Sequence, residues 1–166
     1  MKTDAVNAVI AGLRDTSVAV VATLPEGKLR QLVVALGNHD EFVHVPVCRE
    51  EEAIGVVCGA YLAGKRAVMV CMSAGVLTCP NALVTLSLAA QIPVAMVVGY
   101  SGGLSEDVWL HTPLGLYLEP VLDALHIPYR EASSADQARE VVAEIVEWSY
   151  KARRPAAALL NREALR

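Results

Sequence analysis

The sequence predicts an α/β fold in three layers, doubly wound, with a mainly parallel six-stranded sheet between the helices. Short apolar runs alternate with helical stretches along the whole chain, and strands joined by helices run parallel with right-handed crossovers. The chain is 54% hydrophobic but only 5% aromatic, which suits Val-rich strands covered on both faces. Its 166 residues fit one domain of ordinary size, so we expect a single domain over residues 1–166.

The expected elements follow one another in a regular order. Apolar runs rich in Val, Ile and Ala predict strands, whereas amphipathic stretches with capping residues or a final Gly predict helices. The predicted strands are residues 17–23, 41–47, 66–72, 92–99, 127–132 and 154–161. The predicted helices are residues 3–14, 26–36, 50–64, 78–91, 114–126 and 135–152, and the polar segment 101–113 is predicted to be a loop.

Charge, apolar runs and cysteine spacing argue against several classes of protein. The net charge is −4 and Lys and Arg form no long runs, so nucleic acid is not expected as a main partner. No apolar run approaches the roughly 20 residues that span a bilayer, and the first residues lack a signal-peptide pattern. The four cysteines show no metal-site spacing, so we expect reduced thiols in a cytoplasmic protein without a metal site of its own.

A ligand site is expected at one edge of the sheet, because open parallel sheets bind ligands outside the carboxyl ends of their strands. The chain contains neither a Walker A loop nor a Gly-rich dinucleotide fingerprint leading into a helix, and it has no GxSxG nucleophile elbow. The polar residues that follow the predicted strands at this edge are Lys28, Arg30, Glu50, Ser73, Asn81, Ser101, Glu106, Asp107 and His111.

Three consecutive glutamates stand where the third predicted helix begins. Acids in the first turn of a helix are favoured by the helix dipole, by about 0.3–1 kcal/mol each. A helix-start role therefore accounts for Glu51 and Glu52, and from the residues alone it accounts for Glu50 as well.

Glu50 also begins a longer pattern. Gly59 follows it nine residues later, and then come a strand and a Gly-containing turn in RAVMVCMSAGVLTCPNAL, followed by EDVWLHTPLG and LDALHIPY. With these segments the chain resembles, over nearly its whole length, the pyrimidine-binding domain of thiamine diphosphate enzymes. Among them it looks most like the alpha subunits of sulfopyruvate decarboxylase and the matching half of phosphonopyruvate decarboxylase.

The resemblance implies roles for individual residues. Glu50 would hydrogen-bond the N1′ atom of the aminopyrimidine and exchange a proton with it, as a catalytic and cofactor-binding residue. His111 would face the substrate and relay protons. Ser73, Gly75 and Asn81 would line the cofactor site. Lys28 or Arg30 would supply a positive charge for the anionic tail of the substrate, 3-sulfopyruvate or 3-phosphonopyruvate. Both are predicted helix residues, however, and a solvent-exposed cation explains them equally well.

One position departs from the family pattern. Leu77 stands where the turn is expected to have a second Gly. We expect its φ to be below zero and its side chain to pack on the pyrimidine or on a partner subunit, which would reshape the pocket.

The chain also lacks a motif that thiamine diphosphate enzymes need. It contains no Gly-Asp-Gly sequence, which holds the Mg²⁺ that bridges the diphosphate in such enzymes. The resemblance therefore implies a beta subunit that carries this motif and the Mg²⁺, and at least two copies of each chain. Two alternatives stay open: a carboligase or lyase on the same scaffold, and a non-catalytic, flavodoxin-like binding module.

Overall fold

The described residues fold around one sheet of six strands. The computed structural model describes residues 1–102 and 106–165, and every strand pairing in it is parallel. The strand order is β2-β1-β3-β4-β6-β5. The strands are β1 (Val20–Thr23), β2 (Val43–Pro46), β3 (Ala67–Met72), β4 (Val94–Gly99), β5 (Tyr129–Ala132) and β6 (Pro155–Leu160).

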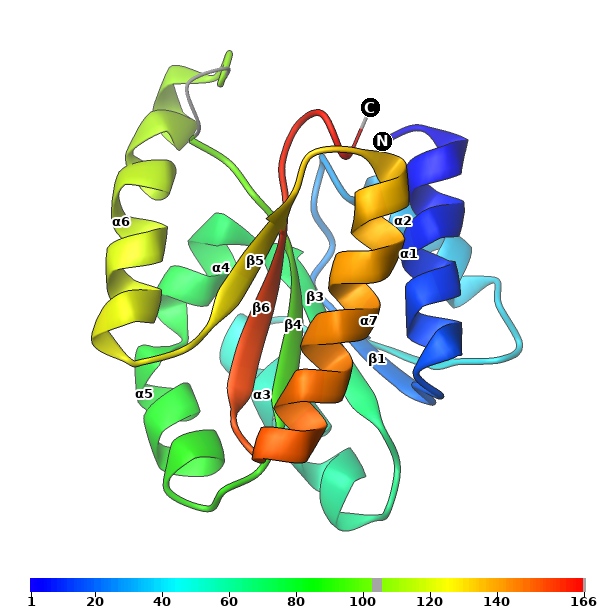
Figure 1. Cartoon of the computed structure of the whole chain (residues 1–166), viewed down its shortest axis with the longest axis vertical. Helices are drawn as coiled ribbons and strands as arrows, with labels where there is room; N and C mark the ends of the chain where they lie inside the picture. Colours follow the sequence, from blue (N-terminus) through cyan, green and yellow to red (C-terminus); the bar gives the residue numbers. More distant parts are fainter. Residues whose placement is uncertain (103–105, 166) are drawn as a thin grey trace.

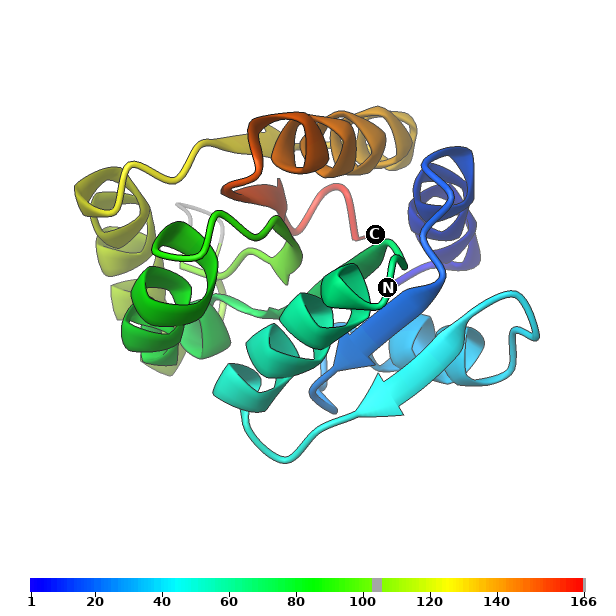
Figure 2. The ribbon, with the colours of Figure 1, turned by 90° about the horizontal axis from the view of Figure 1, so that it is seen from below.

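Helices cover both faces of this sheet, so the predicted three-layer α/β architecture is confirmed (Figures 1 and 2). One face carries α1 (Thr3–Asp15), α2 (Arg30–Gly37) and α7 (Ala135–Ala152). The other face carries α3 (Glu50–Leu62), α4 (Ser73–Thr78), α5 (Pro80–Ala82), the π-helix η1 (Leu83–Leu88) and α6 (Thr112–Ala124). A short 3-10 helix, η2 (Trp109–His111), leads into α6.

The strands divide the core in two because successive side chains of a strand point to opposite faces. On β3, Val68 and Val70 pack towards α1, α2 and α7. Met69 and Cys71 alternate with them and pack towards α3 and α6. All six residues of β3 are buried, which accounts for the continuous apolar run that predicted this strand.

The strand order places a natural ligand site between β1 and β3. The chain moves from β1 outwards to β2 and then returns to β3 on the other side of β1. In open α/β sheets the crevice at such a reversal is where ligands bind, at the carboxyl ends of the strands. Lys28 follows β1 and Gly75 follows β3, so both lie beside this crevice.

Several predicted elements differ from the structure in their bounds. The predicted helix 78–91 is α5 followed by the π-helix η1, and α6 begins at Thr112 and not at residue 114. Helix α2 begins at Arg30, not at residue 26, because the carboxylate of Glu26 accepts a hydrogen bond from Leu29 N and closes a turn there. Lys28 is therefore a turn residue. The segment after β3 is the helix α4 and not a turn, and Gly75 lies inside it. Within the ranges that the structure describes, none of the helices has the length and apolar character that crossing a bilayer requires.

Candidate active site

The three glutamates at the start of α3 have three different environments. Glu52 closes the helix start, since its carboxylate accepts hydrogen bonds from the backbone N–H groups of Cys48 and Arg49 at 3.0 and 3.2 Å. Glu51 pairs with the guanidinium of Arg49 at 3.1 Å. The carboxylate of Glu50 accepts no hydrogen bond from any residue in the described part of the chain, although its side chain is partly buried. Of the three carboxylates, only that of Glu50 has no hydrogen-bond donor on either oxygen among the described residues.

The side chain of Glu50 lies directly against Gly75 of α4. A methyl group at Gly75 would stand 2.5 Å from Cγ and 2.6 Å from Oε1 of Glu50. Real contacts of a Cβ atom are longer than 3.0 Å, so only glycine leaves room for this carboxylate. The sequence therefore brings together two of the predicted site residues, one from the end of β2 and one from the end of β3.

A second group of polar side chains surrounds Glu106, in the segment before α6. Lys28 Nζ donates hydrogen bonds to Ser101 Oγ at 2.9 Å and to Glu106 Oε2 at 2.7 Å. The backbone N–H groups of Gly102 and Val108 also donate to the Glu106 carboxylate, each at 3.1 Å. Burial opposes the charge of Glu106, but these hydrogen bonds outweigh it and lower its pKa from 4.5 to about 2. Glu106 therefore remains a carboxylate at neutral pH.

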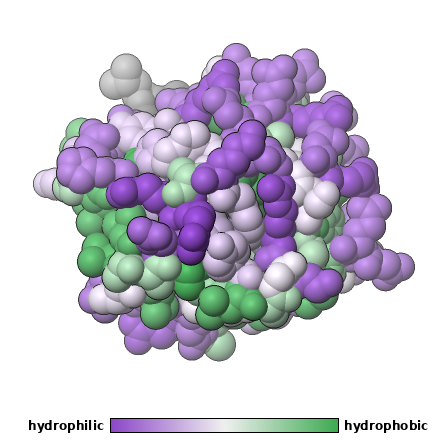
Figure 3. Space-filling model, turned by 60° about the horizontal axis from the view of Figure 1, so that its bottom comes forward, coloured by the Kyte–Doolittle hydropathy of each residue, from purple (hydrophilic) through white to green (hydrophobic). Residues whose placement is uncertain are grey.

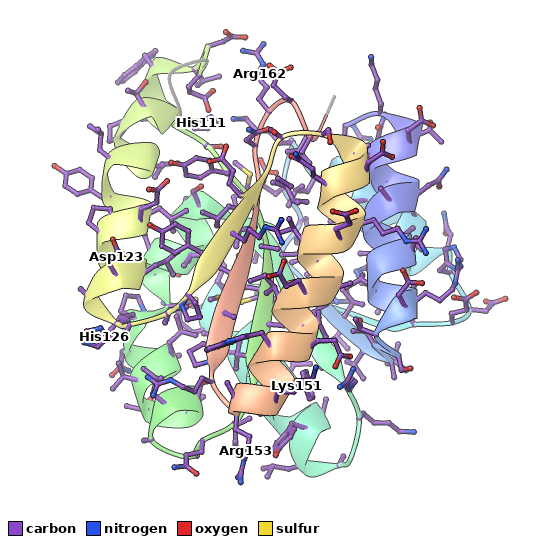
Figure 4. The ribbon with its side chains drawn as sticks, viewed as in Figure 1. His111, Asp123, His126, Lys151, Arg153 and Arg162 are labelled. Carbon is purple, nitrogen blue, oxygen red and sulfur yellow. The ribbon has the colours of Figure 1, made fainter. Side chains whose placement is uncertain are left out.

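His111 lies beside this carboxylate. Its Nδ1 atom is 3.6 Å from Glu106 Oε1, and 27% of its side chain is exposed. Figure 4 shows His111 at the end of α6 nearest Arg162, whereas His126 lies at the opposite end of that helix. Of these two histidines, only His111 therefore lies near the carboxyl edge of the sheet.

Ser73 connects the two groups. It is fully buried at the first position of α4, and its hydroxyl accepts a hydrogen bond from Ser101 N at 3.0 Å and donates one to Gly99 O at 3.4 Å. Ser101 in turn accepts from Lys28. Hydrogen bonds thus connect α4, whose Gly75 lies against Glu50, to the segment between β4 and α6 that carries His111.

Two glycines fix that segment to α6. Gly102 has a φ of +94°, a backbone conformation that residues other than glycine rarely adopt. Its backbone meets that of Gly115 so closely that a Cβ on either residue would come within 2.2 Å of the other. The Gly in the LHTPLG segment therefore determines how close the start of α6 approaches the end of β4.

The remaining predicted site residues are more exposed. Asn81 and Arg30 are exposed on α5 and α2. Leu77 has no positive φ, as expected, and packs partly buried against the core on the α3 side. A cavity of about 220 Å³ lies beside Lys28 and Glu106. Its lining is completed by Met1, Asp107, Val108, Arg162 and Leu165.

Sequence reasoning placed Glu106 at this edge but gave it no role. A single acidic residue in a polar loop gives no sign that it will be buried, and its partner Lys28 is 78 residues away. Within residues 1–102 and 106–165, no group of three or more His, Cys, Asp or Glu side chains is placed to hold a metal ion.

Large apolar side chains are exposed next to the site. Trp109 is 83% exposed, and Leu110, Leu116 and Tyr117 are each more than 60% exposed. Figure 3 shows apolar surface gathered along the side on which α5 and α6 lie. Apolar patches of this kind mark surfaces that contact another protein.

Comparison with solved structures defines the class of fold. A 2-oxoglutarate:ferredoxin oxidoreductase from Magnetococcus marinus, solved with 2-oxoglutarate, coenzyme A and succinyl-CoA bound, superposes with a TM-score of 0.75 at 17% identity. The match covers 97% of this chain and 29% of that one. The chain therefore has the fold of one part of that oxidoreductase. At the carboxyl edge of its sheet, a carboxylate without a hydrogen-bond donor among the described residues lies over a glycine.

Comparison with curated proteins identifies the family. Sulfopyruvate decarboxylase subunit alpha from Methanothermobacter thermautotrophicus is 32% identical over 97% of this chain and 98% of its own length. The protein of the same name from Methanocaldococcus jannaschii is 28% identical over 93% of this chain and 91% of its own length. Models of known protein families give no match. The chain belongs to the family of sulfopyruvate decarboxylase alpha subunits.

Proposed function

We propose that this chain is the alpha subunit of a heteromeric, thiamine diphosphate-dependent decarboxylase that acts on 3-sulfopyruvate. The observation that carries the proposal is the Glu50 carboxylate, which lies against Gly75 with no hydrogen-bond donor among the described residues. The family resemblance and the names of the relatives supply the cofactor and substrate.

The residues present fit this cofactor. A partly buried carboxylate without a partner is suited to accept a hydrogen bond from a ring N–H and to exchange a proton with it. Gly75 gives the space that a Cβ would fill. Thiamine diphosphate, when bound, supplies an electron sink for the electron pair that is released as the substrate loses CO2.

The other site residues act around this carboxylate. Ser73 holds the start of α4 and thereby the position of Gly75, while Asn81 at the surface of α5 contacts the cofactor. His111 faces the substrate and moves protons to or from it. Lys28 uses two of its three N–H donors within the chain, so the third can donate to the sulfonate tail.

A partner subunit completes the site in this proposal. It carries the Gly-Asp-Gly motif, the Mg²⁺ and the diphosphate contacts that this sequence lacks, and at least two copies of each chain assemble. The relatives are called subunit alpha, and the exposed apolar residues around Trp109 offer a surface for association.

The test is co-expression with a partner that contains Gly-Asp-Gly, followed by measurement of CO2 release from a panel of 2-oxo acids. We expect release from 3-sulfopyruvate that requires thiamine diphosphate, Mg²⁺ and both chains. A pair carrying Glu50→Gln is the matched control. If CO2 is released only from 3-phosphonopyruvate, the proposed substrate is wrong. Carbon–carbon bond formation without CO2 release from 3-sulfopyruvate would favour the carboligase alternative.

A further inference from the structure

One ring nitrogen of His111 is buried without a hydrogen-bond partner among the described residues. That nitrogen is Nδ1. A buried polar atom without a hydrogen-bond partner lowers the stability of the fold by about 1–3 kcal/mol. Such an atom is rare in folded proteins and therefore needs an explanation. Because Nδ1 is buried and 27% of the side chain is exposed, the accessible part of the residue lies away from Nδ1.

The nearest charged group to this nitrogen is the carboxylate of Glu106. Its Oε1 atom stands 3.6 Å from Nδ1, which is slightly beyond a normal hydrogen bond. The carboxylate cannot rotate away, because Lys28 Nζ and the N–H groups of Gly102 and Val108 all donate to it. Only 7% of the Glu106 side chain is exposed, so water screens its charge poorly.

The fixed carboxylate decides where the proton of the ring resides. A neutral imidazole carries its proton on one nitrogen and a lone pair on the other. With the proton on Nε2, the lone pair of Nδ1 would face a buried negative charge, which is repulsive. With the proton on Nδ1, an N–H group points towards the carboxylate, and a small shift of the ring closes the 3.6 Å gap.

We propose that Glu106 is a positioning residue that holds the proton of His111 on Nδ1 and so leaves the lone pair of Nε2 free on the accessible side of the ring. Nε2 is then the atom that accepts a proton from, or returns one to, the bound substrate. This last step rests on the proposed function, whereas the position of the proton does not.

The proton position can be read by long-range ¹H–¹⁵N correlation spectra of the full chain labelled with ¹⁵N-histidine, recorded above pH 8. The chain has four histidines, and the His111→Gln variant identifies the signals of His111. We expect the pattern of a proton on Nδ1 in the wild-type chain. A wild-type pattern with the proton on Nε2 would overturn the proposal without any further variant.

Variants at position 106 then test the cause. Glu106→Gln places an amide that can donate to Nδ1, so the balance should move towards the Nε2–H form, while Glu106→Asp keeps the carboxylate and should retain the wild-type form. Glu119→Gln is the matched control. Glu119 lies on the helix that follows His111, but its carboxylate bonds to Tyr100 and Tyr129, so its loss should leave the pattern unchanged. An unchanged pattern in folded Glu106→Gln would contradict the assigned cause.

The catalytic step is tested separately in the assembled pair. We expect Glu106→Gln to lower kcat about 100-fold, a typical contribution of positioned proton transfer, with kcat largely restored in Glu106→Asp. The change in KM, which arises through Lys28, the partner of Glu106, should be much smaller than the change in kcat. A loss that appears only in KM would refute the role of Nε2. If the wild-type pair releases no CO2 although the spectra show the Nδ1–H form, the proposed function fails and the proton position stands.

Discussion

The contact between Glu50 and Gly75 makes a sharp prediction for Gly75→Ala. The added methyl group would lie 2.5 Å from Glu50 Cγ and 2.9 Å from Cδ. Carbon atoms in contact prefer about 3.5–4.0 Å, so the Glu50 side chain has to move by about 1 Å. A displacement of that size in a reacting group can cost about 100-fold in rate. We therefore expect kcat of the assembled pair to fall about 100-fold.

The stability of the chain should not fall in parallel. Gly75 lies within α4, where alanine is favoured over glycine by up to about 1 kcal/mol. All three colliding atoms, Cγ, Cδ and Oε1, belong to the Glu50 side chain, which can rotate about its χ angles, so the backbone need not move. Urea unfolding should therefore give an unchanged or slightly higher free energy of unfolding. In a Glu50→Ala background the collision is removed, and Gly75→Ala should then stabilise by the full helix preference.

Gly55→Ala serves as the control, because a Cβ at Gly55 of α3 would meet nothing within 4 Å. Gly55→Ala should raise the free energy of unfolding of the isolated chain by the full helix preference of alanine, up to about 1 kcal/mol. It should leave the position of Glu50 unchanged. The reasoning is refuted if Gly75→Ala pairs decarboxylate at the wild-type rate, or if Gly75→Ala is as stabilising with Glu50 present as without it.

Three further predictions concern neighbouring residues. Glu50→Gln should lower kcat by about 10²–10⁴-fold in steady-state assays, whereas Glu51→Gln and Glu52→Gln should stay within about threefold because their carboxylates serve the helix start; an inactive Glu51→Gln would shift the assignment by one residue. Leu77→Ala should lower the free energy of unfolding in urea by about 1–2 kcal/mol, less than the 2–5 kcal/mol of a fully buried leucine, and no change would place this side chain in solvent. The lowered pKa of Glu106, about 2 in place of 4.5, stabilises the fold above pH 4.5, and this contribution is lost as the pH falls towards 2. The stability advantage of wild type over Glu106→Gln should therefore be constant above pH 5 and shrink below pH 4, and an advantage independent of pH would rule out the ionised pair as its source.

The alternation of strands and helices was readable from the sequence because each buried strand is a short apolar run. β3 and β4 are buried at every position, and such runs stand out even without alternation. The start of α2 was missed because the turn that Glu26 closes has a sequence that is also typical of the first turn of a helix. The helix α4 was missed because a glycine in a sequence usually indicates a turn. Here Gly75 lies inside a helix and leaves room for the side chain of Glu50.

The candidate site was only partly readable for a similar reason. Glu50 was singled out only by the family resemblance, in which its spacing to Gly59 takes part, and the structure adds that its carboxylate differs from those of its two neighbours. The contacts of Glu106 depend on Lys28, 78 residues earlier, and on the path of the backbone at Gly102. Distances of this kind are set by tertiary packing, which no local pattern encodes.

The position of β6 has a consequence for how the chain folds during synthesis. Among these six strands β6 is synthesised last, yet it lies between β4 and β5 in the sheet. Until it emerges, β5 has no strand to pair with and β4 presents an open edge, which is prone to pair with other chains. Sheets that depend on such distant pairings form slowly, and partly made chains of this type aggregate readily. We expect the nascent chain to depend on chaperones, or on prompt completion of translation, more than its size alone would suggest.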